Sequence, residues 1–586
     1  LNINKKLTRP FHQIEEMDLS GISEKALNVL LEASKVSLKK LKLCSINIIG
    51  DELNTFESVL EKLETLQLDW CKFTEQGFYE LMRIVNPNLK TLIMNCDELT
   101  WEEQAGKHLC LGKLTKLKIN IYGVYDITPN VLFYILQSCT TNLKCLNLKA
   151  SDFTFEEELG QLPTGLFSIR YLNLTYCHNI TNVGFKHLLR ISGSGIESLK
   201  IKDTKLTGEG LTDVPSLNAL ENLDAKESKL SDAGLKTLFI QSGQRLRYLS
   251  LAKTDVTGET MNEFVDKFPN LERIDLSNCI KLTNQGLCNM LQTCGPELKV
   301  IDLSQTKVTG SLHELETGFK KLRKLNLNRC SQFTGLIDFL SRSGSHLKHL
   351  DLGGTNITGE EIDTSVKRLR VSYLNLSGCK ELTNSGLQKL LAVCGLFIKY
   401  LFLCSTNITG EGLAVISKQL SLNHLQTLGL NGCKLLTTLG LLEFLRIAGK
   451  DLKALHLSKV NITGEGMAGV TQVSTTIKQL NLSKCKSLTD AGLCEMVRVF
   501  GHSVMTLDLS GTNITGEGLL DRVPRMSNLR SLNLSYCKEL THEGLPQLLH
   551  VAGRQLRKLD ISHTNMADIS TRHVPNCNII FYNCNI

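Results

Sequence analysis

Apolar residues recur along this chain in a short segment with the spacing Leu-x-x-Leu-x-Leu-x-x-Cys. Three clear copies are Leu425–Cys433 (LQTLGLNGC), Leu529–Cys537 (LRSLNLSYC) and, with one Ile, Ile477–Cys485 (IKQLNLSKC). A sister form ends in Thr, as in Leu347–Thr355 (LKHLDLGGT) and Val504–Thr512 (VMTLDLSGT). Between residues 169 and 556 the segments start about 26 residues apart, and weaker copies extend back to residue 14. A fixed period of this length predicts an array of about 22 repeated units.

Each unit combines a strand pattern with a helix pattern. The Leu-x-Leu alternation predicts a short strand with one buried face. The apolar spacing after the turn is helical, as in Thr489–Val497 (TDAGLCEMV), and Thr489 is suited to cap that helix. One strand and one helix cannot bury their own apolar faces, so neighbouring units must stack. We therefore expect an α/β solenoid, a horseshoe or partly closed ring, with a parallel sheet on the concave face and helices on the convex face.

The Thr-ended units carry a glutamate just after the turn. In the motif Thr-Gly-Glu-Gly-Leu, these residues are Glu209, Glu411 and Glu517. We expect each to stand at the N-terminus of a helix, where the helix dipole favours an anion. Because the residues recur without converging, we expect them to cap helices and not to catalyse a reaction or bind a metal.

These motifs resemble those of a known family. Leu374–Leu387 (LNLSGCKELTNSGL) is similar to the cysteine-containing leucine-rich repeats, which form horseshoes of the ribonuclease-inhibitor type. That subclass is typical of F-box substrate receptors of cullin-type ubiquitin ligases and of related mitotic-exit proteins. The resemblance implies a leucine-rich repeat solenoid, a protein partner and a ubiquitin-ligase adaptor as a further partner. No F-box-like segment precedes the first repeat at Ile14.

Composition narrows the class of protein further. The 586 residues are 42% hydrophobic, with a mean hydropathy of −0.04. No apolar run approaches the ~18–20 residues that cross a bilayer, so no membrane association is expected. A net charge of +7 is modest over this length, and no nucleic-acid partner is expected. We divide the chain into a lead-in (1–13), the repeat array (14–577) and a C-terminal capping strand (578–586).

Cysteines occupy a regular position in the repeats. Spacings of mostly about 50 residues indicate small buried hydrophobes and not disulfide partners, which favours the cytoplasm, with the nucleus as an alternative. Cys577 and Cys584 near the end are expected to complete the terminal cap. The regular positions are Cys177, Cys279, Cys330, Cys379, Cys433, Cys485 and Cys537.

The motifs of common enzymes are not found. The sequence has no Gly-x-x-x-x-Gly-Lys-Ser/Thr, His-Glu-x-x-His, Gly-x-Ser-x-Gly or Cys-x-x-Cys. Its 14 histidines show no metal-ligand spacing. We therefore expect neither catalysis, nor a metal, nor a cofactor.

Two polar rows are expected to face the concave side. One lies between the paired leucines and is often Asn or Asp, as at Asp351, Asn375 and Asp508. A second row follows the first leucine and is often basic. These rows keep an exposed sheet soluble and neutralise each other, or they form a surface for an acidic or phosphorylated partner. The basic row comprises Lys299, Arg323, Lys348, Lys399, Lys453, Lys478, Arg530 and Arg557.

Aromatic residues interrupt these rows and mark candidate partner-binding positions. Tyr373 and Tyr400 occupy the same place in adjacent repeats, Phe402 lies beside Tyr400, and His349 precedes them by one unit. Exposed rings on a rigid sheet are common binding anchors. A second candidate is the irregular stretch Asn120–Asn130 (NIYGVYDITPN), where one repeat is longer. More isolated rings are Trp70, Tyr171, Tyr176, Tyr248 and Tyr536.

Two functions remain open from the sequence. The first is a non-enzymatic scaffold that binds a protein or peptide on its concave face, as in the substrate receptor of a ubiquitin ligase. The second is the ligand-sensing domain of an intracellular innate immune receptor. An extracellular receptor is a weaker third, because terminal disulfide caps are missing, and an enzyme is a fourth.

Overall fold

The computed structural model describes most of the chain and divides it into two compact units, unit 1 (1–295) and unit 2 (296–586). The described residues are 13–85, 88–95, 111–120, 129–139, 141–151, 153–315, 318–362, 366, 368–413, 422–467, 476–520, 523–566, 577–580 and 582. Most of the lead-in, most of the stretch at 120–130, and Cys584 lie outside them.

Unit 1 contains one parallel sheet in which each strand pairs with the strand of the next repeat. Successive leucines are in register, as Leu199 is with Leu223. A second, two-stranded sheet pairs β3 (Asn47–Ile48) with β5 (Lys72–Phe73). The strands of the main sheet are β1 (Glu16–Ser20), β2 (Lys40–Cys44), β4 (Thr65–Asp69), β6 (Thr91–Asn95), β7 (Lys116–Ile119), β8 (Cys145–Asn147), β9 (Tyr171–Asn173), β10 (Ser198–Lys200), β11 (Asn222–Asp224), β12 (Tyr248–Ser250) and β13 (Arg273–Asp275).

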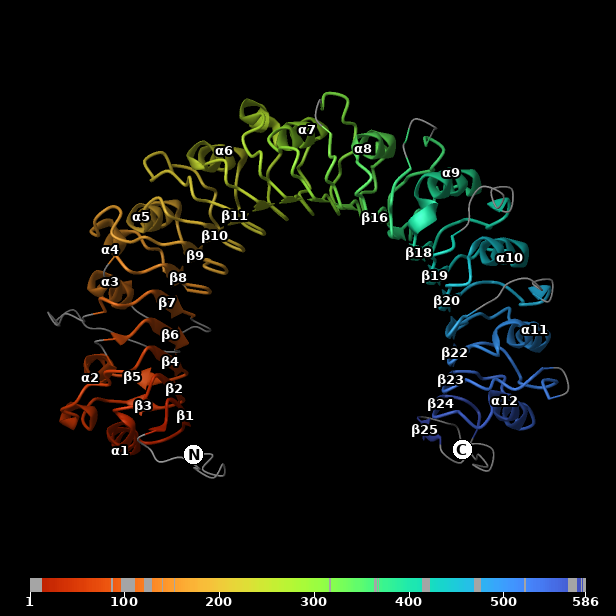
Figure 1. Ribbon diagram of the computed structural model, residues 1–586, viewed down its shortest axis with the longest axis horizontal. Coiled ribbons are helices and arrows are strands. Elements are labelled where there is room, and N and C mark those ends of the chain that lie inside the picture. Colours follow the sequence, from red (N-terminus) through yellow and green to blue (C-terminus); the bar gives the residue numbers. More distant parts are fainter. Residues whose placement is uncertain are drawn as a thin grey trace. The chain divides into compact units, whose positions relative to one another are not determined.

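The helices of unit 1 lie on the outer side of its sheet, as Figure 1 shows from α1 to α7. Most of them begin at a Ser or Thr whose side chain accepts a hydrogen bond from the backbone amide three residues later. Thr181, for example, accepts from the Gly184 amide. The helices are α1 (Glu24–Ser34), α2 (Glu75–Val85), α3 (Pro129–Ser138), α4 (Glu157–Gly160), α5 (Asn182–Ser192), α6 (Asp232–Gln241) and α7 (Asn284–Gln292), with short 3-10 turns η2 (Leu53–Thr55) and η4 (Glu259–Phe264).

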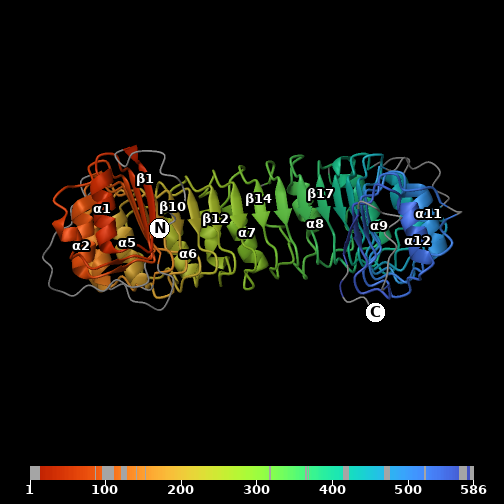
Figure 2. The same cartoon turned by 90° about the horizontal axis from the view of Figure 1, so that it is seen from below.

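Unit 2 repeats the arrangement with shorter strands, again paired in parallel with the next repeat. Figure 2 shows β14 and β17 pointing in the same direction. The strands are β14 (Val300–Asp302), β15 (Lys324–Asn326), β16 (His349–Asp351), β17 (Tyr373–Asn375), β18 (Tyr400–Phe402), β19 (Thr427–Gly429), β20 (Ala454–His456), β21 (Gln479–Asn481), β22 (Thr506–Asp508), β23 (Ser531–Asn533), β24 (Lys558–Asp560) and β25 (Asn578–Ile580).

The helices of unit 2 cover the outer side of its sheet (Figure 1). Apolar side chains of these helices are buried, as are the strand leucines. Leu350 and Leu352 of one repeat are both fully buried, and their counterparts in the repeats from β14 to β24 are buried as well. The predicted parallel sheet with helices on one face is therefore confirmed in each unit. The helices are α8 (Leu336–Arg342), α9 (Asn384–Cys394), α10 (Thr438–Ile447), α11 (Asp490–Phe500) and α12 (Gly544–Ala552), with the 3-10 turn η5 (Gly395–Phe397).

The regular cysteines are free thiols in the core, as the spacing predicted. Their row is buried but not purely apolar. Cys379 Sγ donates to the carbonyl of Leu352, at 3.0 Å, and Thr355 Oγ1 donates to the same oxygen, at 2.7 Å. The Cys of one repeat and the Thr of the preceding repeat thus satisfy one buried carbonyl together, which explains why the two forms alternate.

A helix in every unit was a wrong prediction. From residue 182 onward, the α-helices found within the described residues occupy alternate repeats. The described parts of the Thr-ended repeats carry turns or, at Glu259–Phe264, the 3-10 turn η4. In four of these repeats a pair of glycines flanks the glutamate and opposes a helix, as Gly410 and Gly412 do with φ of 80° and 89°, outside the helical region.

The glutamates of these repeats consequently cap the neighbouring helix and not their own. Glu411 Oε1 accepts a hydrogen bond from Thr437 Oγ1, at 2.7 Å, and Thr437 is the N-cap of α10. Glu209 accepts from Ser231, the N-cap of α6, at 3.1 Å. The carboxylates do stand at helix N-termini, as expected, but they link one repeat to the next.

The glycine of the Thr-x-x-Gly-Leu motif allows a helix to touch the backbone of the preceding repeat. A Cβ at Gly184 in α5 would lie 1.9 Å from the Thr154 carbonyl oxygen. The same approach recurs at Gly234, Gly286, Gly386, Gly440, Gly492 and Gly544. Any larger residue there would push the helix away from the stack.

Candidate functional site

Side chains on the inner face of each sheet form rows because the strands are in register. In unit 2, His349, Tyr373 and Tyr400 open three successive strands and are direct partners. Two residues further along each strand come Asp351, Asn375 and Phe402. We call these the first and second inner rows.

The structure brings four of the five predicted aromatic residues of unit 2 together. The rings of His349 and Tyr373 are stacked, with centroids 4.1 Å apart and an interplanar angle of 5°. The Tyr373 ring also contacts Phe402, at 5.6 Å and 48°. Tyr400 is the next residue in the first row and is 40% exposed. We call His349, Tyr373, Tyr400 and Phe402 the aromatic wall.

The second inner row is structural in most repeats. The Asn375 Oδ1 accepts a hydrogen bond from the amide of Ser377, at 3.0 Å, and Asp508 does the same for Ser510, at 3.0 Å. These bonds satisfy a backbone donor as the chain leaves the strand. A polar residue is therefore required here by the turn as well as by solubility.

Three adjacent strands lack that polar residue. Phe402, Gly429 and His456 occupy the second row in β18, β19 and β20. A Cβ at Gly429 would lie 2.7 Å from Phe402 Cδ1, so the glycine leaves room for the ring. The row thus gives up its turn-forming residue in the strands that border the aromatic wall.

Burial favours the uncharged forms of two residues of the wall, His349 and Tyr373. Burial lowers the pKa of His349 below its usual 6.5, and nearby Lys324 lowers it further. Burial raises the pKa of Tyr373, and the charge of Asp351 adds to this effect. His456 is half-buried, which lowers its pKa too. The surface therefore offers ring edges and neutral polar atoms to a partner.

The other predicted rings fall in two different places. Tyr171 and Tyr248 belong to the first inner row of unit 1, where Lys200 and Arg273 lie over them at 5.6 and 5.5 Å. They are not joined in one cluster. Tyr176 lies in the turn that follows β9. The ammonium nitrogens of Lys149 and Lys202 lie 5.5 and 5.4 Å from the centre of its ring.

Trp70 and Tyr536 lie outside the inner rows. Both follow the strand at a turn position with positive φ, 55° and 61°, and both are about half exposed. The Tyr536 ring stacks on His563 at 4.3 Å. These residues are exposed, as expected, but at the edge of the sheet.

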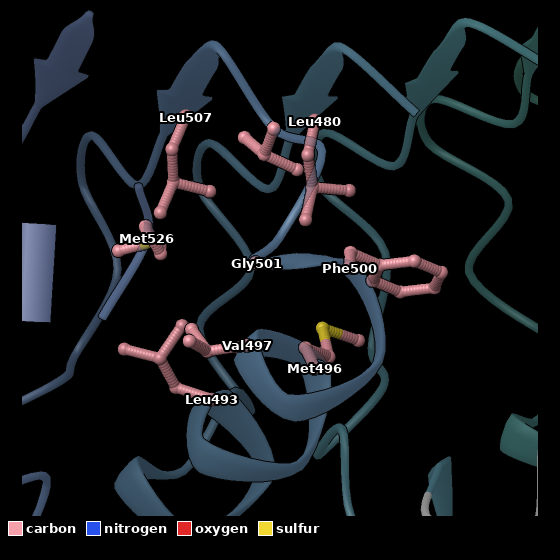
Figure 3. A pocket seen from close by; sticks show the side chains of 9 residues that line it. Leu480, Leu493, Met496, Val497, Phe500, Gly501, Leu507 and Met526 are labelled. Carbon is pink, nitrogen blue, oxygen red and sulfur yellow. The ribbon is translucent and has the colours of Figure 1, made fainter. Parts of the chain in front are cut away.

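A cavity lies in the core of unit 2 between α11 and the strands β21 and β22. Figure 3 shows Leu480, Leu507, Met526 and side chains of α11 pointing into it. Its volume is ≈ 10 Å³ and its walls are apolar, so it holds at most about one water molecule. It is a packing defect of the core and not a binding site.

The described part of the chain also lacks the features of a metal site and of a membrane-spanning helix. Those residues contain no group of three His, Cys, Asp or Glu side chains that could hold a metal ion. None of their helices is both long enough and apolar enough to cross a membrane.

Sequence reasoning found the aromatic wall but missed two positions beside it. Gly429 and His456 do not stand out in the sequence as the large rings of Tyr400 and Phe402 do. The break in the Asn and Asp row over three successive repeats was the available signal. It becomes meaningful only once the hydrogen bond from that row to the following turn is known.

The comparisons with known proteins agree with the repeat pattern. The model described as "Leucine Rich repeat" matches residues 345–360, 371–391, 473–494, 502–521 and 525–545. The Antagonist of mitotic exit network protein 1 of Candida albicans is 28% identical over 156 residues, which is 26% of this chain and 22% of that protein. The putative RNA-binding protein EEED8.10 of Caenorhabditis elegans is 24% identical over 349 residues, or 51% of this chain and 44% of that one.

A solved structure is also similar. The LRR protein LIC12759 of Leptospira interrogans aligns with a TM-score of 0.41 and 18% sequence identity, covering 96% of this chain and 100% of that one. This chain spans less than half the length of the curated relatives it matches, at 22%, 44% and 33% of their sequences.

Proposed function

Because this chain is a leucine-rich repeat protein, we propose that it is a non-enzymatic recognition scaffold that binds a protein or peptide segment at the aromatic wall. The observation that carries this proposal is the local replacement of the polar second row by Phe402, Gly429 and His456 beside three first-row rings. A residue needed for the turn has been given up in adjacent strands, and a phenyl ring, a glycine and an imidazole stand where other strands carry a carboxylate or an amide.

The geometry of the wall suits a binding hot spot. Rings held on adjacent strands lose little side-chain freedom when a partner covers them. Tyr373 is fixed between His349 and Phe402 by ring contacts, whereas Tyr400 remains 40% exposed and able to gain burial. We propose Tyr400 and Phe402 as the principal contacts and His349 and Tyr373 as their support.

A finer assignment is the substrate-receptor subunit of a cullin-type ubiquitin ligase, with the ligase adaptor as a second partner. It is supported by the Cys-ended repeat, which resembles that of F-box receptors and mitotic-exit proteins. The similarity to a protein named as an antagonist of the mitotic exit network fits the same group. The alternative is the ligand-sensing domain of an intracellular innate immune receptor. We place the protein in the cytoplasm or nucleus in both cases.

The test compares the intact chain with the Tyr400→Ala/Phe402→Ala variant in quantitative affinity capture, followed by titration calorimetry with the main captured protein. A matched control is Leu435→Ala/Leu439→Ala, which removes apolar side chains that are 55% and 51% exposed near and on α10. We expect the aromatic variant to lose the partner, with affinity falling about tenfold or more. The control should keep it.

Two outcomes contradict the proposal. Equal affinity of the aromatic variant and the parent would remove the wall from the binding surface. A large fall in the unfolding temperature would show that the rings stabilise the core. If the intact chain captures a cullin-type adaptor, the finer assignment is supported. If it captures a signalling receptor domain and no such adaptor, the alternative is supported.

A further inference from the structure

The residue just before each strand forms a third row, along the edge where the strands begin. Its carbonyl accepts two amides of the next repeat: Arg323 O accepts from Lys348 N at 2.9 Å and from His349 N at 3.0 Å. The same pair of bonds recurs from one repeat to the next in both units. Residues at this position therefore stand one strand apart, about 5 Å. We call them the leading row.

In unit 1 the leading row is electrically balanced. Cations and carboxylates of neighbouring strands form ion pairs across the row, at N–O distances from 2.7 to 3.8 Å. Five residues are basic, five are acidic and one is neutral, so the row has no net charge. Its members are Glu15, Lys39, Glu64, Lys90, Thr115, Lys144, Arg170, Glu197, Glu221, Arg247 and Glu272.

In unit 2 the same row contains cations and no carboxylate. The net charge of the whole chain is +7, and the eight cations of this row contribute +8. All the other residues of the chain therefore carry a net charge of −1. The remaining members, Ser372, Gln426, Met505 and Cys577, are uncharged. The cations are Lys299, Arg323, Lys348, Lys399, Lys453, Lys478, Arg530 and Arg557.

Seven of these cations, from Arg323 to Arg557, are exposed and form no ion pair within the described residues. The nearby carboxylates have other partners: Asp351 accepts from Asn375 Nδ2 at 2.9 Å, and Asp508 accepts from the Ser510 amide. The interpretation that the basic row neutralises the mid-strand acids therefore does not hold in unit 2. Like charges on adjacent strands repel each other, so this row carries an electrostatic cost that the balanced row of unit 1 avoids.

We propose that the leading row of unit 2 docks an extended protein segment rich in Asp and Glu. Each repeat contributes at most one charge to this row, and the charges of the row lie in a line. This distribution fits carboxylates spread along a segment, whereas a phosphorylated residue is usually held by several donors that converge on one point.

The neighbouring side chains favour a polypeptide over single-stranded nucleic acid. From Lys453 to Arg557 the first inner row beside the cations contains Ala454, Gln479, Thr506, Ser531 and Lys558, which offer no ring for base stacking. Where rings do occur, His349 and Tyr373 stack on each other and cover one face of each ring.

This inference rests on the proposed role as a protein-recognition scaffold and names the chemistry of a partner segment. It concerns a different row from the aromatic wall, so the two can be tested apart. The Tyr400→Ala/Phe402→Ala variant should bind an acidic segment as the parent does.

The experiment measures fluorescence anisotropy of a labelled 16-residue peptide of alternating Glu and Ser, titrated with the full chain at about 50 and 200 mM salt. The probes for comparison are the corresponding Gln-Ser peptide and a 16-nucleotide uridine RNA. The test variant is Lys453→Gln/Lys478→Gln/Arg530→Gln/Arg557→Gln. The matched control, Lys39→Gln/Lys90→Gln/Arg170→Gln/Arg247→Gln, removes the same charge from the balanced row of unit 1.

We expect the Glu-Ser peptide to bind more tightly than both other probes and to weaken at higher salt. The unit 2 variant should lose about tenfold in affinity, and the control should stay within about twofold of the parent. Equal losses in both variants would show a general effect of net charge and overturn the proposal. So would equal binding of the Gln-Ser peptide, or tighter binding of the RNA, which would assign the row to nucleic acid.

Discussion

Thr512 and Cys537 lie one repeat apart and donate to the same carbonyl oxygen, that of Leu509. The distances are 2.7 Å from Thr512 Oγ1 and 3.1 Å from Cys537 Sγ, and the two side chains are 3.5 Å apart. Both residues are completely buried. The alternation of Cys and Thr along the sequence is therefore one hydrogen-bonding device that joins successive repeats through the core.

The first prediction follows from the position where this device is incomplete. Val460 replaces the threonine, so no hydroxyl donates to Leu457 O, which accepts from Cys485 Sγ at 3.0 Å and from the Val460 amide at 3.2 Å. We expect Thr512→Val to lower the free energy of unfolding by about 1 kcal/mol, because a buried hydrogen bond is lost. The free energy of unfolding of Val460→Thr should be at most about 0.5 kcal/mol below that of the parent, or above it, because the new hydroxyl can donate to the Leu457 carbonyl. Urea denaturation checks both, and an equal loss in the two variants would contradict the shared-carbonyl device.

A second prediction concerns the contact between a helix and the preceding repeat. Gly184→Ala would place a methyl group 1.9 Å from the Thr154 carbonyl oxygen, so we expect a loss of about 3 kcal/mol as α5 moves away. The control is Gly195→Ala, whose Cβ would lie 3.6 Å from the Ile169 oxygen in ordinary contact. It should change the unfolding free energy by less than about 0.5 kcal/mol. If thermal unfolding shows the two variants alike, the close approach is not a constraint.

The sequence predicted strands and buried cysteines correctly because both depend on a local period. Leu350 and Leu352 alternate with polar residues, and this alternation, repeated along the array, indicates a strand with one buried face. The helices were predicted in too many repeats because apolar spacing alone does not exclude a turn. The glycines at 410 and 412 carried the missing information. The pairing of charges in unit 1 and its absence in unit 2 needed the register, since partners such as Lys39 and Glu15 lie 24 residues apart.

The third prediction tests how Phe402 is held in the aromatic wall. Gly429→Ala would bring a methyl group to 2.7 Å from Phe402 Cδ1 and force the ring to move. Because Gly429 has no positive φ, the change acts through this contact and not through backbone strain. We expect partner affinity to fall severalfold with an unfolding free energy within about 1 kcal/mol of the parent. Unchanged affinity would mean that the position of the Phe402 ring does not matter for binding.

A fourth prediction concerns thiol reactivity. Burial raises the pKa of Cys279 to about 11 and that of Cys294 and Cys394 to about 12, so little thiolate exists at neutral pH. We expect these thiols to resist alkylation in the native protein and to react fully in urea. Cys44 and Cys404 are partly exposed and should be labelled first. Peptide mapping by mass spectrometry checks the order, and fast native labelling of Cys394 would contradict the buried assignment.

The last prediction is a pH dependence at the wall. Burial lowers the native pKa of His349 and of His456 below the value of 6.5 expected when unfolded. Lys324 also lowers the pKa of His349, and Asp351 and Asp302 oppose this effect. Between the native and unfolded pKa values the unfolded chain binds more protons, so stability falls as pH decreases through that window. Above about pH 7 this contribution is fully present.

The measurement compares urea midpoints of the parent and the His349→Gln/His456→Gln variant at pH 7.5 and pH 5.5. Carboxylates elsewhere affect both proteins alike, so the difference between them isolates the two imidazoles. The parent should lose more stability than the variant on acidification, because glutamine does not titrate. An equal loss in both proteins would show that burial in the native protein lowers the pKa of neither histidine.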